Sequence, residues 1–124
     1  MSPGAVSAAI TVGAVGRGDR RSAFSNFGSC VDLWAPGEDI TSVGIDGPQA
    51  TRVLSGTSQA APHVAGAAAM LIQQRPRATP EEVRRLLMLH ATQDRVVDAR
   101  GAGNRLLYTG CVNRPAAVPW LFGM

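Results

Sequence analysis

A hydroxyl that could act as a nucleophile stands at Ser58, directly before a run of small and apolar residues. Residues 55–66 read Ser-Gly-Thr-Ser-Gln-Ala-Ala-Pro-His-Val-Ala-Gly. The first turn of a helix presents unpaired amides and the positive end of the peptide dipoles, which stabilise the oxyanion formed when a hydroxyl attacks a carbonyl. A serine in this position could act as a nucleophile, with its own backbone amide as an oxyanion donor. The competing interpretation is an ordinary serine N-cap.

Neither histidine of the chain is placed by its sequence spacing to serve as the base for this serine. His63 follows Ser58 by five residues, and five steps along an α-helix turn a side chain by about 140°. We therefore predict that His63 is a structural residue of the helix. His90 falls at helical spacing with apolar residues, which predicts a partly buried helix residue and not a catalyst.

Short apolar runs predict strands on both sides of this serine. Residues 8–15 and 30–34 are apolar and partly β-branched, as expected for parallel strands that are covered on both faces. Residues 39–43 and 51–54 flank an Asp-Gly-Pro turn, which predicts a β-hairpin. The segment 104–108 predicts a final strand or docking segment.

The serine is predicted to begin a central, buried helix over residues 58–74. Pro62 is tolerated there because a proline in the first turn removes only an amide that has no intrahelical acceptor. A second helix is predicted to begin at Thr79, with Pro80 in the first helical position and Glu82 completing a capping box. Its apolar residues fall on one face, so we expect it to pack on one side only.

The composition excludes several classes of protein. The 124 residues are 45% apolar and 17% charged, which is typical of a globular chain. The net charge is +3, but the 12 basic residues, all arginine, are scattered and aromatic residues make up only 5%, so we expect no nucleic-acid partner. The apolar stretch 60–72 is too short to cross a bilayer, so we expect no membrane partner. The first residues lead directly into a predicted strand, so we expect no signal peptide within this chain.

The stretch around Ser58 resembles the nucleophile signature of the subtilisin-like serine proteases. The consensus of that signature runs Gly-Thr-Ser, a variable residue, a small residue, and then Pro-His-Val-Ala-Gly. The resemblance implies that Ser58 is the catalytic serine. The residues to which it gives a structural role are Gly56, Thr57, Pro62 and His63.

Further segments resemble the proteinase K-like branch of the same family. These segments are residues 2–3, 9–14, 24–28, 31–33, 35–37 and 104–107. The resemblance implies an α/β fold, namely the C-terminal portion of a three-layer αβα architecture with a mostly parallel sheet. We expect residues 1–108 to be the C-terminal part of the peptidase domain and residues 109–124 to be an irregular tail.

The resemblance also implies that other catalytic groups lie outside this chain. The family orders its triad Asp, His, Ser, and nothing before Ser58 resembles its Asp or His motifs or the asparagine of its oxyanion hole. Asp32 is not the missing acid, because no part of the resemblance gives it a catalytic role. We therefore expect a serine endopeptidase with protein or peptide substrates, inactive here without the N-terminal part of its domain.

The resemblance implies no cofactor for the chemistry, but it does suggest a structural metal. It places a weak calcium site at the main-chain carbonyls of Ser7 and Ala9 with the carboxylate of Asp32. A solvated aspartate at a strand end is the alternative. Cys30 resembles a cysteine that forms a disulfide in secreted relatives, but the partner cysteine is absent from this chain. Cys30 is therefore expected to be a free, buried thiol or to pair with Cys111. Because those relatives are secreted, the resemblance also implies that this protein is secreted.

One departure from the family pattern keeps other functions open. Gln59 stands where the family commonly has a methionine. The stretch Gly-Thr-Ser-Gln-Ala at residues 56–60, together with residues 35–40, also resembles a proprotein convertase of this family that cleaves only itself and then acts as a binding protein. A non-catalytic binding module and an inactive truncated gene product are therefore the alternatives to a protease.

Overall fold

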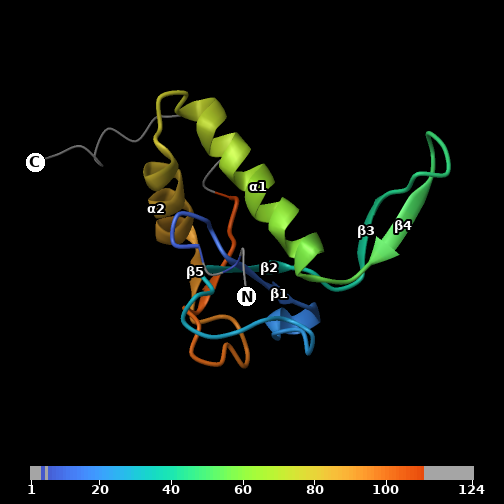
Figure 1. Cartoon of the computed structure of the whole chain (residues 1–124), viewed down its shortest axis with the longest axis horizontal. Helices are drawn as coiled ribbons and strands as arrows, with labels where there is room; N and C mark the ends of the chain where they lie inside the picture. The colour runs from blue at the N-terminus through green and yellow to red at the C-terminus, as the bar shows by residue number, and fades with distance from the viewer. Residues whose placement is uncertain (1–3, 5, 111–124) are drawn as a thin grey trace, which may run out of the picture.

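A small sheet forms the centre of the computed structural model, which describes residue 4 and residues 6–110 (Figure 1). β1 (Val12–Val15) and β2 (Leu33–Pro36) pair in parallel. β6 (Arg105–Leu106) pairs in parallel with β2, and β5 (Thr92–Gln93) pairs antiparallel with β6. The strand order is β1-β2-β6-β5, so the predicted α/β fold with a mostly parallel sheet is confirmed.

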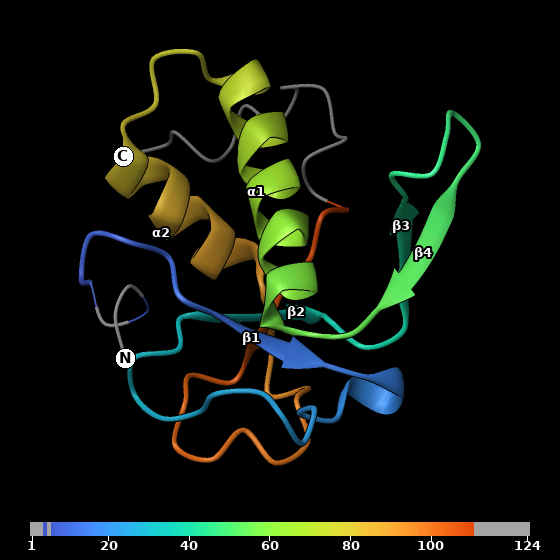
Figure 2. The ribbon, with the colours of Figure 1, turned by 45° about the vertical axis from the view of Figure 1, so that its right-hand side comes forward.

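The two helices, α1 (Thr57–Gln74) and α2 (Pro80–His90), follow from local signals. The capping box of α2 forms as predicted, because the Glu82 amide donates to Thr79 Oγ1 at 3.2 Å and the Thr79 amide donates to the Glu82 carboxylate at 2.7 Å. α1 begins one residue earlier than predicted, and its N-cap is Gly56. Both helices lie on the same side of the sheet (Figure 2).

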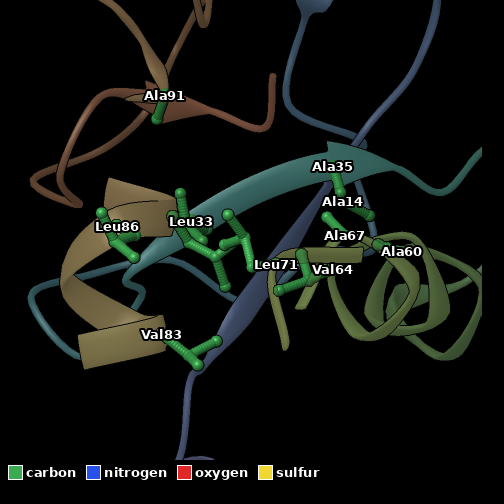
Figure 3. Close-up of a cluster of buried hydrophobic side chains, with 11 residues drawn as sticks. Ala14, Leu33, Ala35, Ala60, Val64, Ala67, Leu71, Val83, Leu86 and Ala91 are labelled. Atoms are coloured by element: carbon green, nitrogen blue, oxygen red, sulfur yellow. The ribbon is translucent and has the colours of Figure 1, made fainter. Parts of the chain in front are cut away.

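The main core lies between these helices and the sheet (Figure 3). Buried residues of α1 recur at intervals of three or four, which places them along one stripe of the helix. Two of the four are alanines, so the helix can approach the strands closely. The buried side chains are Ala60, Val64, Ala67 and Leu71 of α1, Ala14, Leu33 and Ala35 of the strands, Val83, Leu86 and Leu87 of α2, and Ala91.

The opposite face of α1 is exposed within the described part of the chain. His63 lies on the exposed side, and Ile72 is 46% exposed. The prediction of a buried central helix therefore holds for one stripe only, because no described segment covers the other face. Pro62 lies in the first turn without interrupting the helix, as predicted.

Loops cover the other face of the sheet in the described residues (Figure 2). Trp34 is fully buried there, in a second cluster with Val15, Val31 and Val96, and its indole N–H donates to the Gly103 carbonyl at 2.9 Å. This loop layer includes one 3-10 helix, at residues 17–19. The second helical layer implied by the family resemblance therefore has no counterpart in the loops that cover this face.

β3 (Ile40–Val43) and β4 (Thr51–Leu54) form the predicted antiparallel hairpin, which projects from the body of the molecule (Figure 1). The strand predicted over 30–34 begins only at Leu33, and the one predicted over 104–108 is limited to β6. Most of the predicted tail, from residue 111 onward, lies outside the described residues. Among the helices that are described, none has the length and apolar character needed to span a membrane.

Candidate active site

Ser58 lies in the first turn of α1, with an exposed side chain. The helix begins at Thr57, and the Gln59 amide donates to the Gly56 carbonyl at 3.0 Å, whereas the amides of Thr57 and Ser58 have no acceptor among the described residues. Gly56 is the N-cap and no side chain caps the helix, which rules out the interpretation of Ser58 as an N-cap. The structure thus places an accessible hydroxyl beside free amides at the positive end of a helix dipole.

A direct contact between the sheet and the start of α1 holds this serine in place. The Gly37 amide donates to the Val15 carbonyl at 2.9 Å, and the Gly37 carbonyl accepts from the Gly56 amide at 2.7 Å. The loop is fixed a second time where the Asp39 amide donates to Ser55 Oγ at 2.9 Å. The end of β2 therefore determines where α1 begins.

Ser58 lines a cavity of about 350 Å³ between α1 and the hairpin. One wall is formed by β3 and the other by the first two turns of α1. The lining residues are Ile40, Thr41, Ser42, Ser58, Gln59, Pro62 and His63. A larger cavity, of about 410 Å³, lies around Arg75 and Arg77, between α1 and α2, and Ser58 does not line it. We regard the cavity beside the hairpin as the candidate active site, because it alone contains the nucleophile.

His63 lines the same cavity as Ser58, and one nitrogen of its ring is bonded within the helix. Its Nδ1 lies 2.8 Å from the carbonyl oxygen of Gln59. A carbonyl only accepts, so Nδ1 carries a proton and donates it to the preceding turn of the helix. No hydrogen bond joins His63 to Ser58 in the described residues, which agrees with a structural role for this histidine. His90 is half-buried on α2, as predicted.

The residues expected to hold calcium come together but do not fit the ion. Ser7, Ala9 and Asp32 line one cavity of about 240 Å³. Both carboxylate oxygens of Asp32 are already bonded, one to the Thr11 amide at 2.9 Å and the other to the Arg84 guanidinium at 2.8 Å. A cation bound to this carboxylate would lie next to a permanent positive charge, which opposes its binding.

Cys30 differs from expectation, because its side chain is exposed and the prediction was of a buried thiol. It lies in the turn that precedes β2, where the chain is still at the surface. Its alternative partner, Cys111, lies outside the described residues. In the part of the chain that is described, no group of three His, Cys, Asp or Glu side chains could hold a metal ion.

Comparison with known proteins decides the family. The model of the subtilase family matches residues 1–106. This chain belongs to the subtilase family. The "Extracellular serine proteinase" of Thermus sp. (strain Rt41A) is 51% identical over 109 residues, which cover 87% of this subtilase chain and 27% of the Thermus protein. "Alkaline serine exoprotease A" of Vibrio alginolyticus is 46% identical over 108 residues, which cover 87% of this chain and 20% of the Vibrio protein.

A solved structure gives the same family. The crystal structure of a cold-adapted subtilisin-like serine proteinase superposes with a TM-score of 0.84 at 47% identity, over 87% of this chain and 39% of that one. The subtilisin-like fold expected from the sequence is therefore confirmed. This subtilase chain spans less than a third of the two relatives it matches.

Two parts of the site have no clear signal in the sequence. The contact of Gly37 with Gly56 joins residues 19 positions apart, and no local pattern predicts it. The wall formed by β3 depends on how the hairpin is oriented, which the turn sequence does not specify. The Ala-Pro-Gly segment that ends at Gly37 is part of the family resemblance, and that was the only available pointer.

Proposed function

We propose that this chain is the C-terminal part of a subtilisin-like serine endopeptidase domain, with Ser58 as its nucleophile. The observation that carries the proposal is the exposed hydroxyl in the first turn of α1, beside free amides and within a cavity. Relatives that share this stretch are named serine proteinases. Protein or peptide substrates follow from that reaction class.

The reaction would proceed through an acyl-enzyme. Ser58 Oγ forms a bond to the carbonyl carbon of the scissile peptide while its proton passes to a base. The carbonyl oxygen becomes an oxyanion, which accepts a hydrogen bond from the Ser58 amide. The C–N bond then breaks as the amine leaves with a proton, and water hydrolyses the ester that remains on Ser58.

The base is proposed to come from a segment outside these 124 residues. The chain has two histidines: His63 makes no hydrogen bond to Ser58 in the described residues, and His90 lies on α2 and does not line the cavity of Ser58. The two relatives are far longer than the matched region, so each has room for the Asp, His and Asn groups elsewhere in its domain. Without them Ser58 keeps an oxyanion donor but loses its proton acceptor.

The surface that would receive this segment surrounds the serine. α1 exposes the face that is turned away from the sheet, and the hairpin exposes Val43 (86%), Ile45 (91%) and Val53 (59%). Apolar side chains at such exposure favour an additional packing partner. Because one relative is named extracellular, we propose that the assembled domain acts outside the cell.

Complementation tests this proposal. The chain is co-expressed with a segment of a related subtilase that carries the Asp, His and Asn motifs, and cleavage of a fluorogenic peptide is followed. We expect activity that disappears in Ser58→Ala and persists in Ser29→Ala, which removes an exposed hydroxyl far along the chain from the site. A complex that forms but cleaves nothing would contradict the protease function and favour a binding module. Equal activity in Ser58→Ala would contradict the choice of nucleophile.

A further inference from the structure

An ion pair joins Asp32, the residue just before β2, to Arg84 of α2 across 52 residues of sequence. Arg84 Nη2 donates to Asp32 Oδ1 at 2.8 Å, and the side chains are only 30% and 15% exposed. The other carboxylate oxygen of Asp32 accepts from the Thr11 amide at 2.9 Å. Asp32 is thus tied both to the segment before β1 and to α2.

Asp32 and Arg84 both line the cavity of about 240 Å³ that Ser7 and Ala9 also line, so this cavity gathers the residues of the expected cation site around a guanidinium. A hard divalent cation needs several oxygen ligands that are free to coordinate it. Here one carboxylate oxygen already accepts from a positive group. An ion on the other oxygen would have to share it with the Thr11 amide and would lie close to Arg84.

The charge on Arg84 is permanent. Its hydrogen bond with Asp32 raises the pKa of this guanidinium further above its ordinary value, and the neighbouring negative charge adds to the effect. The Nε atom of Arg84 is buried and donates to no described group. An unpaired buried donor is stabilised by an acceptor such as a water oxygen and is destabilised by a cation.

We propose that Arg84 is the built-in counter-ion of Asp32 and takes the place of a divalent cation in this cavity. The guanidinium neutralises the carboxylate and connects it to α2, which is what a bound ion would do for the segments around it. The segment before β1 is then held without calcium. This inference concerns the fold and is independent of the proposed protease function.

Amide hydrogen exchange at Thr11 tests the proposal, because that amide donates directly to Asp32. All samples contain trimethylamine N-oxide, which favours the folded chain. In the unmodified chain we expect the same protection in EDTA and in calcium at about 10 mM, well above the range of weak extracellular sites. In Arg84→Gln we expect exchange about tenfold faster in EDTA, with protection regained on adding calcium. Arg85→Gln, which removes a neighbouring exposed arginine, should behave as the unmodified chain does.

Two further variants make the test decisive. Arg84→Lys keeps a cation beside Asp32 and should remain insensitive to calcium, and it serves as the informative variant if Arg84→Gln does not fold. Asp32→Asn should abolish any calcium response gained by Arg84→Gln. Calcium protection of Thr11 in the unmodified chain or in Arg84→Lys would overturn the proposal. So would a folded Arg84→Gln that ignores calcium.

Discussion

Replacing Gly37 with alanine is expected to push the start of α1 away from the sheet. The Gly37 carbonyl accepts from the Gly56 amide at 2.7 Å, so the end of β2 touches the loop that carries Ser58. A Cβ at position 37 would lie 2.6 Å from Ala14 Cβ, 2.8 Å from the Gly56 carbonyl oxygen and 3.2 Å from Ala60 Cβ. These distances are well below the ~3.5–4.0 Å at which carbon atoms attract. None of these three atoms can move by rotating a side chain.

The expected cost follows from these contacts. Overpacking of this kind destabilises by about 1–3 kcal/mol, which corresponds to a change of about 5- to 150-fold in an equilibrium constant. Gly66→Ala is the matched control, because a Cβ there meets no atom within 4 Å and the backbone is helical. Alanine in a helix interior is favoured over glycine by about 0.5–1 kcal/mol. The two substitutions add the same methyl group and should have opposite effects.

Hydrogen exchange of the α1 amides measures both variants. The experiment is run in trimethylamine N-oxide, which favours burial and keeps a chain of low stability folded. Relative to the unmodified chain, Gly37→Ala should lose about 5- to 150-fold in protection, with the largest loss in the first turn of α1, whereas Gly66→Ala should gain slightly. Equal protection in the two variants would refute the reasoning that the glycine at position 37 sets the position of α1.

Three other predictions follow from the helices and the serine. Thr79→Ala should cost about 1 kcal/mol in the free energy of unfolding through loss of the cap. The hydrogen bonds with Thr79 lower the pKa of Glu82 below its ordinary value of 4.5. The capping box therefore stabilises the chain fully above pH 4.5 and loses this contribution as the pH falls below it. If unfolding by acid, followed by circular dichroism, has the same pH dependence in Thr79→Ala as in the unmodified chain, this prediction is contradicted. The isolated chain should be of low stability or aggregate, because one face of α1 is uncovered, and a sharp monomeric thermal transition with strong protection through 60–72 would argue against it. The complemented enzyme should resist peroxide, because Gln59, the residue next to Ser58, has no sulfur to oxidise. Rapid loss of activity in peroxide, with the fold and the cysteines intact, would show that Gln59 is not the residue beside the nucleophile.

Local features of this fold could be predicted from the sequence because their partners are close in the chain. The capping box needs only Thr79 and Glu82, and the hairpin needs only a turn between two β-rich runs. Ser58 was predicted in the first helical turn from the residues on either side of it. Each of these depends on interactions within about a dozen residues.

The rest depends on contacts that the sequence does not encode locally. The sequence predicts Asp32 within a strand, but β2 begins only after it. Its carboxylate accepts hydrogen bonds from the Thr11 amide and from the Arg84 guanidinium, both distant in sequence. The same late start leaves Cys30 in a turn, where it is exposed. α1 is buried along a single stripe because the described segments cover only that side of it. The composition of a helix does not show which of its sides will be covered.

The most direct test of the central claim is labelling with a fluorophosphonate, located by peptide mass spectrometry. We expect the chain by itself to be labelled no faster than Ser58→Ala, because disabling the triad costs roughly 10⁶-fold in a well-studied subtilisin. Adding the segment with the Asp, His and Asn motifs should produce rapid labelling at Ser58. Rapid Ser58-dependent labelling of the chain alone would show that it contains its own base and would contradict the account, as would a formed complex in which Ser58 stays unlabelled.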